Sequence, residues 1–339
     1  MNKALHRFAV ATACCTLVLI VAGGMVTSTG SGLAVPDWPL SYGQVMPPMV
    51  GGIFYEHGHR MIASFVGFLT AILAFWLWRK DSRRWMRILG FVALSAVIVQ
   101  GILGGLTVLY LLPTAISVSH AALAQSFFCL TALIALFTSR WWFDTSPGLD
   151  EPTTRRLLQT GILLVVAVFV QLLLGAVMRH TGSGLAIPDL PLAYDQVLPS
   201  LSPEALQRYN ELQIKTDLRL AADGPLTAFQ IAVHFAHRAW ALVVFTVALF
   251  AFVRFRSESA APRRVRILTA SIFATVIFQF TLGVFTVLTR KNEIITTFHV
   301  ATGALTLVLG VLLVFHIARL GGVVASRFRM IRLRKEVIA

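Results

Sequence analysis

Eight long apolar runs divide this chain of 339 residues. About 20 apolar residues are enough for a helix to cross a bilayer. Because lipid offers no partners to backbone polar groups, and the runs lack the alternation of strands, each run is predicted to be a transmembrane helix. Charged residues make up 13% of the chain, whereas about 25% is usual in soluble domains. We therefore expect an all-α membrane protein with eight transmembrane helices, at roughly 8–27, 57–78, 88–109, 117–138, 157–178, 229–253, 267–289 and 296–318.

The basic residues, which give a net charge of +14, are unevenly distributed between the two sides of the predicted membrane. One side would hold 21 of the 29 Lys and Arg residues, among them Arg79, Lys80, Arg83, Arg84, Arg87, Arg263, Arg264, Arg266, Arg332 and Arg334. Short loops rich in positive charge stay in the cytoplasm. We expect a multi-pass protein of a bacterial inner membrane with both termini cytoplasmic. The basic loops would contact anionic lipids, and no nucleic-acid partner is expected.

The chain contains an internal repeat. TGSGLAVPDWPLSYGQVMP at 29–47 recurs as TGSGLAIPDLPLAYDQVLP at 181–199, with 14 of 19 positions identical at an offset of 152. Later segments recur at an offset of 179, because the second loop carries an insertion at 200–227 with helical spacing. Four spans in each half make the halves parallel in the membrane. The predicted architecture is two pseudo-symmetric parallel four-helix bundles, with halves at 1–148 and 149–339.

Four histidines occupy equivalent places near the outer ends of the even-numbered spans. His59 and His120 are separated by 61 residues, and His237 and His299 by 62. Paired imidazoles on facing helices are typical axial ligands of heme iron. A histidine in a span can also be a hydrogen-bonded packing residue, but polar groups in membranes are costly and usually functional. Zinc prefers three or four converging ligands. The pattern therefore favours one heme per half, toward the outer face.

Further residues are predicted to line these two heme pockets. Arg60 and Arg238 each follow a candidate ligand, and cations suit heme propionates where water is scarce. The alternative is that both arginines extend to the membrane interface. Gln100 and Gln279 belong to the repeated segments and are predicted to be pocket residues.

The two halves differ at one position beside the candidate ligands. Glu56 precedes His59 by three residues, on the same side of the predicted helix, whereas the second half has His234 there. A carboxylate in this place could act as a general base or stabilise a developing cation. The alternative is a solvated residue at the helix mouth. The asymmetry predicts a catalytic site in the N-terminal half and a plain cofactor site in the C-terminal half; the roles of His57 and His234 stay open.

The repeated loops are predicted to be rigid lids over the outer edges of the pockets. Glycines allow tight turns, and the prolines that follow stiffen the chain. Trp38 is predicted to pack on a porphyrin edge, although aromatic residues are common at membrane interfaces. The aspartates are predicted to hydrogen-bond the turns. The candidate lid residues are Gly30, Gly32, Asp37, Gly182, Gly184 and Asp189.

The TGSGLAxPDWP loop, the ExxHR sequence that opens the second span and the paired histidines resemble the heme A synthase family over all eight spans. The resemblance implies an oxidoreductase that converts heme O to heme A by oxidising the C8 methyl of the porphyrin to a formyl, through successive hydroxylations. It implies that Glu56 is catalytic, that His59 and His120 bind heme O, and that His237 and His299 ligate a heme b that passes electrons. It also implies a heme O synthase and the assembly of a terminal oxidase (cytochrome c oxidase) as partners.

The cysteines depart from one pattern in that family. Some members have a cysteine pair in the first outer loop, whereas Cys14, Cys15 and Cys129 lie inside predicted spans. An electron route through such a pair is therefore excluded. The redox partner, the source of the formyl oxygen and the oligomeric state, including a homo-oligomer, stay open.

Two other classes of protein account for part of this sequence. A non-enzymatic diheme electron carrier of the membrane cytochrome b type accounts for the four histidines and two arginines, but not for Glu56 or the lids. A heme transporter would need polar residues along a path through both leaflets, whereas the candidate ligands gather on the outer side. The sequence favours the synthase.

Overall fold

The computed structural model describes residues 2–218 and 224–323. Within these residues eight α-helices are long and apolar enough to cross a membrane, and each predicted run falls on one of them. They are α1 (Lys3–Ser28), α2 (Gly51–Lys80), α3 (Arg84–Leu109), α4 (Thr114–Thr138), α6 (Glu151–His180), α8 (Ala228–Ser257), α9 (Arg263–Leu288) and α10 (Glu293–Leu320). The predicted all-α chain with eight candidate membrane spans is therefore confirmed. Arg332 and Arg334 lie outside the described residues.

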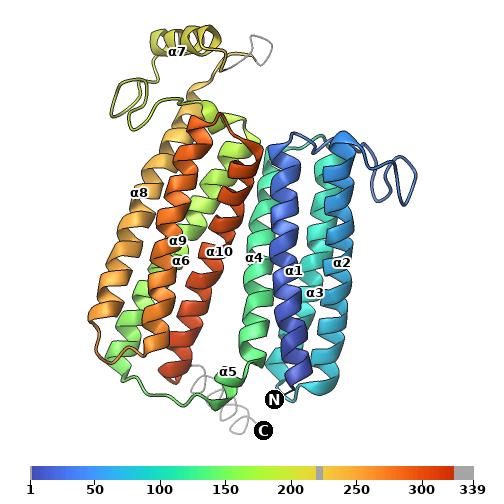
Figure 1. Ribbon diagram of the computed structural model, residues 1–339, viewed down its shortest axis with the longest axis vertical. Coiled ribbons are helices and arrows are strands. Elements are labelled where there is room, and N and C mark those ends of the chain that lie inside the picture. The colour runs from blue at the N-terminus through green and yellow to red at the C-terminus, as the bar shows by residue number, and fades with distance from the viewer. Residues whose placement is uncertain (1, 219–223, 324–339) are drawn as a thin grey trace, which may run out of the picture.

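The long helices stand upright in two neighbouring groups (Figure 1). One group contains α1 to α4 and the other α6, α8, α9 and α10; in each, every helix contacts the next and the last contacts the first. The groups meet through α1 and α4 on one side and α6 and α10 on the other. One end of the molecule carries the residues 29–50, 181–218 and 224–227, and we call it the loop end; the N-terminus lies at the opposite end.

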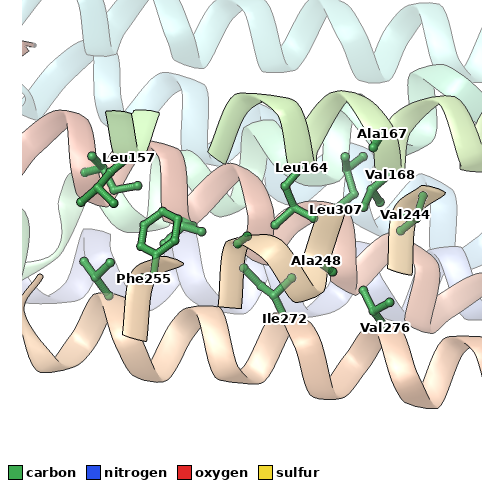
Figure 2. Packing of buried hydrophobic residues seen from close by; sticks show 14 of the residues in the cluster. Leu157, Leu164, Ala167, Val168, Val244, Ala248, Phe255, Ile272, Val276 and Leu307 are labelled. Carbon is green, nitrogen blue, oxygen red and sulfur yellow. The ribbon is translucent and has the colours of Figure 1, made fainter. Parts of the chain in front are cut away.

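Apolar side chains fill the space inside each group of helices. Figure 2 shows this core between α6, α8, α9 and α10, with buried side chains that include Leu164, Ala248, Phe255 and Ile272. A second cluster packs α1 to α4 together. The outward faces are apolar as well, as with Leu242 at 59% exposure. Helices that are apolar all round are expected where the surroundings are lipid.

The insertion in the second half forms a helix, as its spacing predicted. α7 (Pro203–Lys215) begins after Ser202, whose side chain accepts a hydrogen bond from the Ala205 amide, and a proline follows at the first helical position. Residues 219–223 of the insertion lie outside the described residues. Two short elements complete the chain, α5 (Arg140–Asp144) and the 3₁₀ turn η1 (Ser183–Leu185). In Figure 1 α7 lies beyond the ends of the long helices.

Candidate functional site

The four candidate ligands lie at similar depth, each within the first three turns of its helix at the loop end. The imidazoles of His237 and His299 have their ring centroids 6.5 Å apart at an interplanar angle of 71°. His59 and His120 are close enough to interact electrostatically. The structure therefore brings the histidines together in the predicted pairs, one pair in each group of helices.

Each of these imidazoles packs against a glycine of a neighbouring helix. A Cβ atom placed on that glycine would lie closer to the ring than Cβ atoms lie in most real contacts. The distances from such a Cβ to the ring Cε1 are 3.0 Å for Gly23 and His59, 3.2 Å for Gly104 and His120, 3.0 Å for Gly175 and His237, and 3.1 Å for Gly283 and His299. The glycines on α1, α3, α6 and α9 thus form four equivalent seats for imidazoles.

Glutamine side chains lie beside three of the histidines. The Gln171 amide nitrogen lies 3.2 Å from His237 Nε2 and donates to the His237 backbone carbonyl at 3.0 Å. Gln171 was missed from the sequence, because Leu19 occupies its place in the first half and the repeat therefore hides it.

Gln100 and Gln279, which were predicted to be pocket residues, occupy matching places in α3 and α9. Gln100 Nε2 donates to the His120 carbonyl at 3.0 Å, and Gln279 Nε2 lies 3.5 Å from His299 Nε2. The structure brings both glutamines to the candidate ligands. Their contact with a heme stays a prediction.

The polar atoms around the four histidines suit a metal that is already coordinated by a cofactor. His59, His120 and His299 leave Nδ1 buried without a partner, and the side-chain oxygens of Gln100 and Gln279 are unpartnered too. Buried polar groups normally have partners. Among the residues that the structure describes, no group of three or more His, Cys, Asp or Glu is arranged to hold a metal ion. Two imidazoles with a gap between them fit an iron whose remaining ligands come from a porphyrin, since metal–imidazole bonds are about 2 Å.

Glu56 is buried, with 3% of its surface exposed, so the alternative of a solvated helix-mouth residue is wrong. Its Oε2 accepts a hydrogen bond from the Val35 amide at 2.8 Å, and its Oε1 pairs with Arg60 four residues later. His234 occupies the same place in the second half, where its Nδ1 accepts from the Ile187 amide at 3.1 Å. Each side chain therefore anchors its own loop to the helix that carries a candidate ligand.

Arg60 and Arg238 point their guanidinium groups at the loops. Each donates to three backbone carbonyls of its loop, and the bonds are 2.7–3.2 Å long for Arg60 and 3.0 Å for Arg238. The acceptors are Val35, Asp37 and Leu40 for Arg60, and Asp189, Pro191 and Leu192 for Arg238. Both arginines fix the loops to α2 and α8. Their role toward propionates stays a prediction.

The aspartates hold the loop turns, as predicted. Asp37 accepts hydrogen bonds from the amides of Tyr42 at 2.7 Å and Gly43 at 2.8 Å. These amides, Gly43 first, lower the pKa of the Asp37 carboxyl below its ordinary value. Asp189 accepts in the same way from Tyr194 at 2.8 Å and from Asp195 at 3.1 Å.

Of the four candidate lid glycines, Gly30 and Gly182 need the backbone freedom of glycine. Gly30 and Gly182 adopt φ of 69° and 66°, a conformation that other residues rarely take. Gly32 and Gly184 have no positive φ. A Cβ on Gly184 would lie 3.3 Å from Lys291 Cδ, whereas a Cβ on Gly32 would make an ordinary contact with Leu112 at 3.5 Å. Trp38 packs its ring directly over Gly105 of α3, which ties the first loop to that helix.

Within residues 2–218 and 224–323, a helix covers the second loop but not the first. The Tyr194 ring stacks on Tyr209 of α7 with centroids 3.6 Å apart, and only 9% of Tyr194 is exposed. Gln213 of α7 donates to the carbonyls of Leu185 and Ala186 and to the Tyr194 hydroxyl, at 2.8–3.2 Å. Tyr42, the counterpart of Tyr194, is 51% exposed. α7 therefore fastens the second loop alone.

His57, two residues before His59 on α2, contacts the first loop. Its Nδ1 lies 2.8 Å from the Ser41 hydroxyl in the first loop, and both side chains are buried. The second half has Phe235 and Ala193 in these places. The pair is thus a further contact between loop and helix that the first half alone contains.

Comparisons with known proteins place the chain among assembly factors. The COX15-CtaA family, described as "Cytochrome oxidase assembly protein", matches residues 6–52 and 50–313. A heme A synthase of Halalkalibacterium halodurans is 28% identical over 310 residues, which cover 88% of this chain and 92% of that protein. A heme A synthase of Lysinibacillus sphaericus is 25% identical over 304 residues, covering 88% and 90%. One of Shouchella clausii is 31% identical over 212 residues, covering 61% and 69%.

Proposed function

The chain belongs to the COX15-CtaA family of cytochrome oxidase assembly proteins, and we propose that its two histidine pairs hold two hemes with different roles. Like the heme A synthases to which it is similar over most of its length, it is an oxidoreductase that converts heme O to heme A. The reaction oxidises the C8 methyl of the porphyrin to a formyl through successive hydroxylations. The electron partner and the source of the oxygen atom are separate questions.

His59 and His120 bind heme O as the substrate, and His237 and His299 ligate a resident heme b. The glycine seats, the 6.5 Å separation of the second pair and the unpartnered atoms around both pairs support this assignment. A bound heme b supplies one-electron transfer. Gln171 and Gln279 orient the imidazoles of the second pair from neighbouring helices.

Glu56 is the catalytic residue, and its place carries the proposal. It is a buried carboxylate one helical turn from His59, held between a loop amide and Arg60, and the second half has His234 instead. Oxidation removes electrons as well as a proton from the methyl, so positive charge develops on that carbon. A carboxylate fixed beside the substrate can stabilise this charge or accept the proton. His234 keeps the loop anchor but supplies no carboxylate.

The difference between the two loops supports a division between an exchanging substrate and a resident cofactor. No helix among the described residues covers the first loop, and its Tyr42 is half exposed. It can open without breaking contacts to α7, so heme O can enter and heme A can leave past it. The second loop is fastened by Gln213 and Tyr209, which slows release of heme b.

The two groups of helices form pseudo-symmetric parallel bundles, a catalytic half at 1–148 and a heme b half at 149–339. The protein spans a bacterial inner membrane with its basic loops in the cytoplasm and both heme sites toward the outer face. A heme O synthase that supplies the substrate, and a terminal oxidase that takes the product, are the expected partners. A homo-oligomer is compatible with this arrangement.

Extraction of the pigments from the purified protein tests the function. The hemes are released with acid and identified by mass. Heme b together with heme O, an alcohol intermediate or heme A is the expected result. Heme b alone in chains made by cells that produce heme O would contradict the proposal and favour the diheme electron carrier.

A further inference from the structure

Arg179 lies where the two groups of helices meet, in the last turn of α6 at the loop end. Its Nη2 donates to the Gly24 carbonyl of α1 at 2.8 Å and to the Ser28 hydroxyl at 2.9 Å. The same hydroxyl lies 3.1 Å from the hydroxyl of Thr297, which precedes His299 by two residues on α10. Arg179 thus joins α6 to α1 beside the helix that carries a candidate ligand.

The surroundings of Arg179 place it between the two candidate heme sites. Gly24 directly follows Gly23, the glycine on which the His59 ring is seated. On the other side Arg179 lies within electrostatic range of His299. The neighbouring residue, His180, interacts electrostatically with His120.

The charge of Arg179 has no counter-ion in the protein part that the structure describes. The ion pairs found there are formed by other arginines, and no carboxylate approaches Arg179 within 4.0 Å. Both hydrogen bonds of its side chain use Nη2, so Nε and Nη1 have no acceptor among the described residues. A guanidinium in a membrane-spanning helix is costly unless an anion or several acceptors satisfy it.

The other arginines near the sites are already engaged. Arg60 and Arg238 each donate to three loop carbonyls, and Arg60 also pairs with Glu56. Arg179 is also outside the repeat, since its counterpart in the first half is Thr27. The second half therefore has a cation, Arg179, at its boundary with the first half, and the first half has no cation at the equivalent position.

We propose that Arg179 binds a propionate carboxylate of the porphyrin that His237 and His299 ligate. The inference rests on the proposed function and extends it, because the arginines next to the ligands were the ones expected to meet the propionates. Nη2 is occupied by α1, and the Nε–H and Nη1–H groups point to opposite sides of the guanidinium. A propionate oxygen would therefore accept one charge-assisted hydrogen bond from one of these two free donors. The contact would also couple the resident heme to α1 of the catalytic half.

Heme loss from the second site tests this contact without measuring activity. The full-length chain with His59 and His120 both replaced by alanine is purified in detergent with its remaining heme, and transfer of that heme to excess apomyoglobin is followed by absorbance. Arg179→Gln should accelerate the loss about tenfold to hundredfold, the range for a hydrogen bond to a charged group. Arg179→Lys, which keeps the charge but cannot reach α1 and the propionate with separate nitrogens, should fall between. Arg290→Gln is the matched control, because that exposed arginine donates to carbonyls of Thr216 and Asp217 at the same end.

A second probe needs no substitution at position 179. The same chain is loaded with heme b or with its dimethyl ester, whose propionates carry no charge. The chain should lose the ester about tenfold or more faster, and Arg179→Gln should remove that difference. Equal loss of the two hemes from the unsubstituted chain, or an unchanged difference in Arg179→Gln, would overturn the inference. The proposed function fails separately, if heme binding at this site survives loss of His237 and His299.

Discussion

Glu56 and His234 hold the first and second loops by equivalent hydrogen bonds. Each accepts from a backbone amide one residue before a proline, Val35 at 2.8 Å for Glu56 and Ile187 at 3.1 Å for His234. The anchoring task is therefore common to both halves, whereas the carboxylate occurs in one. Substitutions at this position can consequently separate the structural role of the side chain from its chemistry.

Glu56→His should keep the loop anchored and abolish formation of heme A. The imidazole can accept from the Val35 amide as His234 does from Ile187, but it does not restore the carboxylate. Loss of a general base or charge stabiliser lowers rates about 10²- to 10⁴-fold. The protein should therefore retain heme and accumulate heme O or an alcohol intermediate, which mass spectrometry of the extracted pigments detects. His234→Gln, which changes the other anchor, should still produce heme A; normal heme A from Glu56→His would show that Glu56 has no catalytic role.

Gly175→Ala should lower the heme content of the second site. The added methyl would lie 3.0 Å from His237 Cε1, and overpacking of this kind typically costs about 1–3 kcal/mol. Gly101→Ala is the matched control, because nothing lies within 4 Å of its Cβ and alanine is the better helix former. Heme per chain and thermal unfolding should both fall for Gly175→Ala and stay unchanged or rise for Gly101→Ala. Equal heme content and equal thermal unfolding of the two variants would contradict our assignment of Gly175 as the packing site of the His237 ring.

Gln213→Ala should release the second loop from α7. The two hydrogens of the Gln213 amide nitrogen reach three acceptors, including the Tyr194 hydroxyl, so one hydrogen is shared; a full hydrogen bond is worth about 1 kcal/mol. We expect faster proteolysis within residues 181–199 and faster loss of heme b. Glu211→Ala, on the exposed side of the same helix, should leave both rates unchanged. If residues 181–199 are cleaved at the same rate in Gln213→Ala as in the parent protein, α7 does not fasten the second loop.

The turn of the first loop should weaken in acid. Because the amides of Gly43 and Tyr42 lower the pKa of Asp37 below 3.8, its carboxylate stabilises the turn at pH values above 3.8. That stabilisation is lost as the pH falls through the lower pKa of the folded loop. Pepsin cleavage within residues 37–44 should therefore rise more steeply with acid in the parent than in Asp37→Asn. Parallel pH profiles for the two proteins would exclude this role of Asp37.

The sequence predicts the helices and the ligands because both depend on signals that repeat. Transmembrane helices need a fixed length of apolar chain, and eight such runs are visible without any contact information. The candidate histidines are found because the chain contains the pattern twice. Glu56 is found for the opposite reason, because the two halves differ at its position: the second half has His234 there.

Contacts between helices could not be predicted in the same way. Gln171 is paired with Leu19 by the repeat and therefore gives no duplicated signal, although it touches His237. The seats at Gly23 and Gly175 were visible as repeated glycines, but glycine is common in membrane helices and only the packing assigns them to imidazoles. The loop contacts of Arg60 depend on how residues 35–40 fold back over α2, which no spacing rule describes.

The central claim is that each half holds one heme between two imidazoles. Electron paramagnetic resonance and optical spectra of the oxidised, detergent-solubilised protein test it most directly. The double variant His237→Ala/His299→Ala should lose one low-spin bis-imidazole signal and about half of its heme, and should keep the signal of the pair formed by His59 and His120. Spectra and heme content identical to those of the parent would contradict the claim.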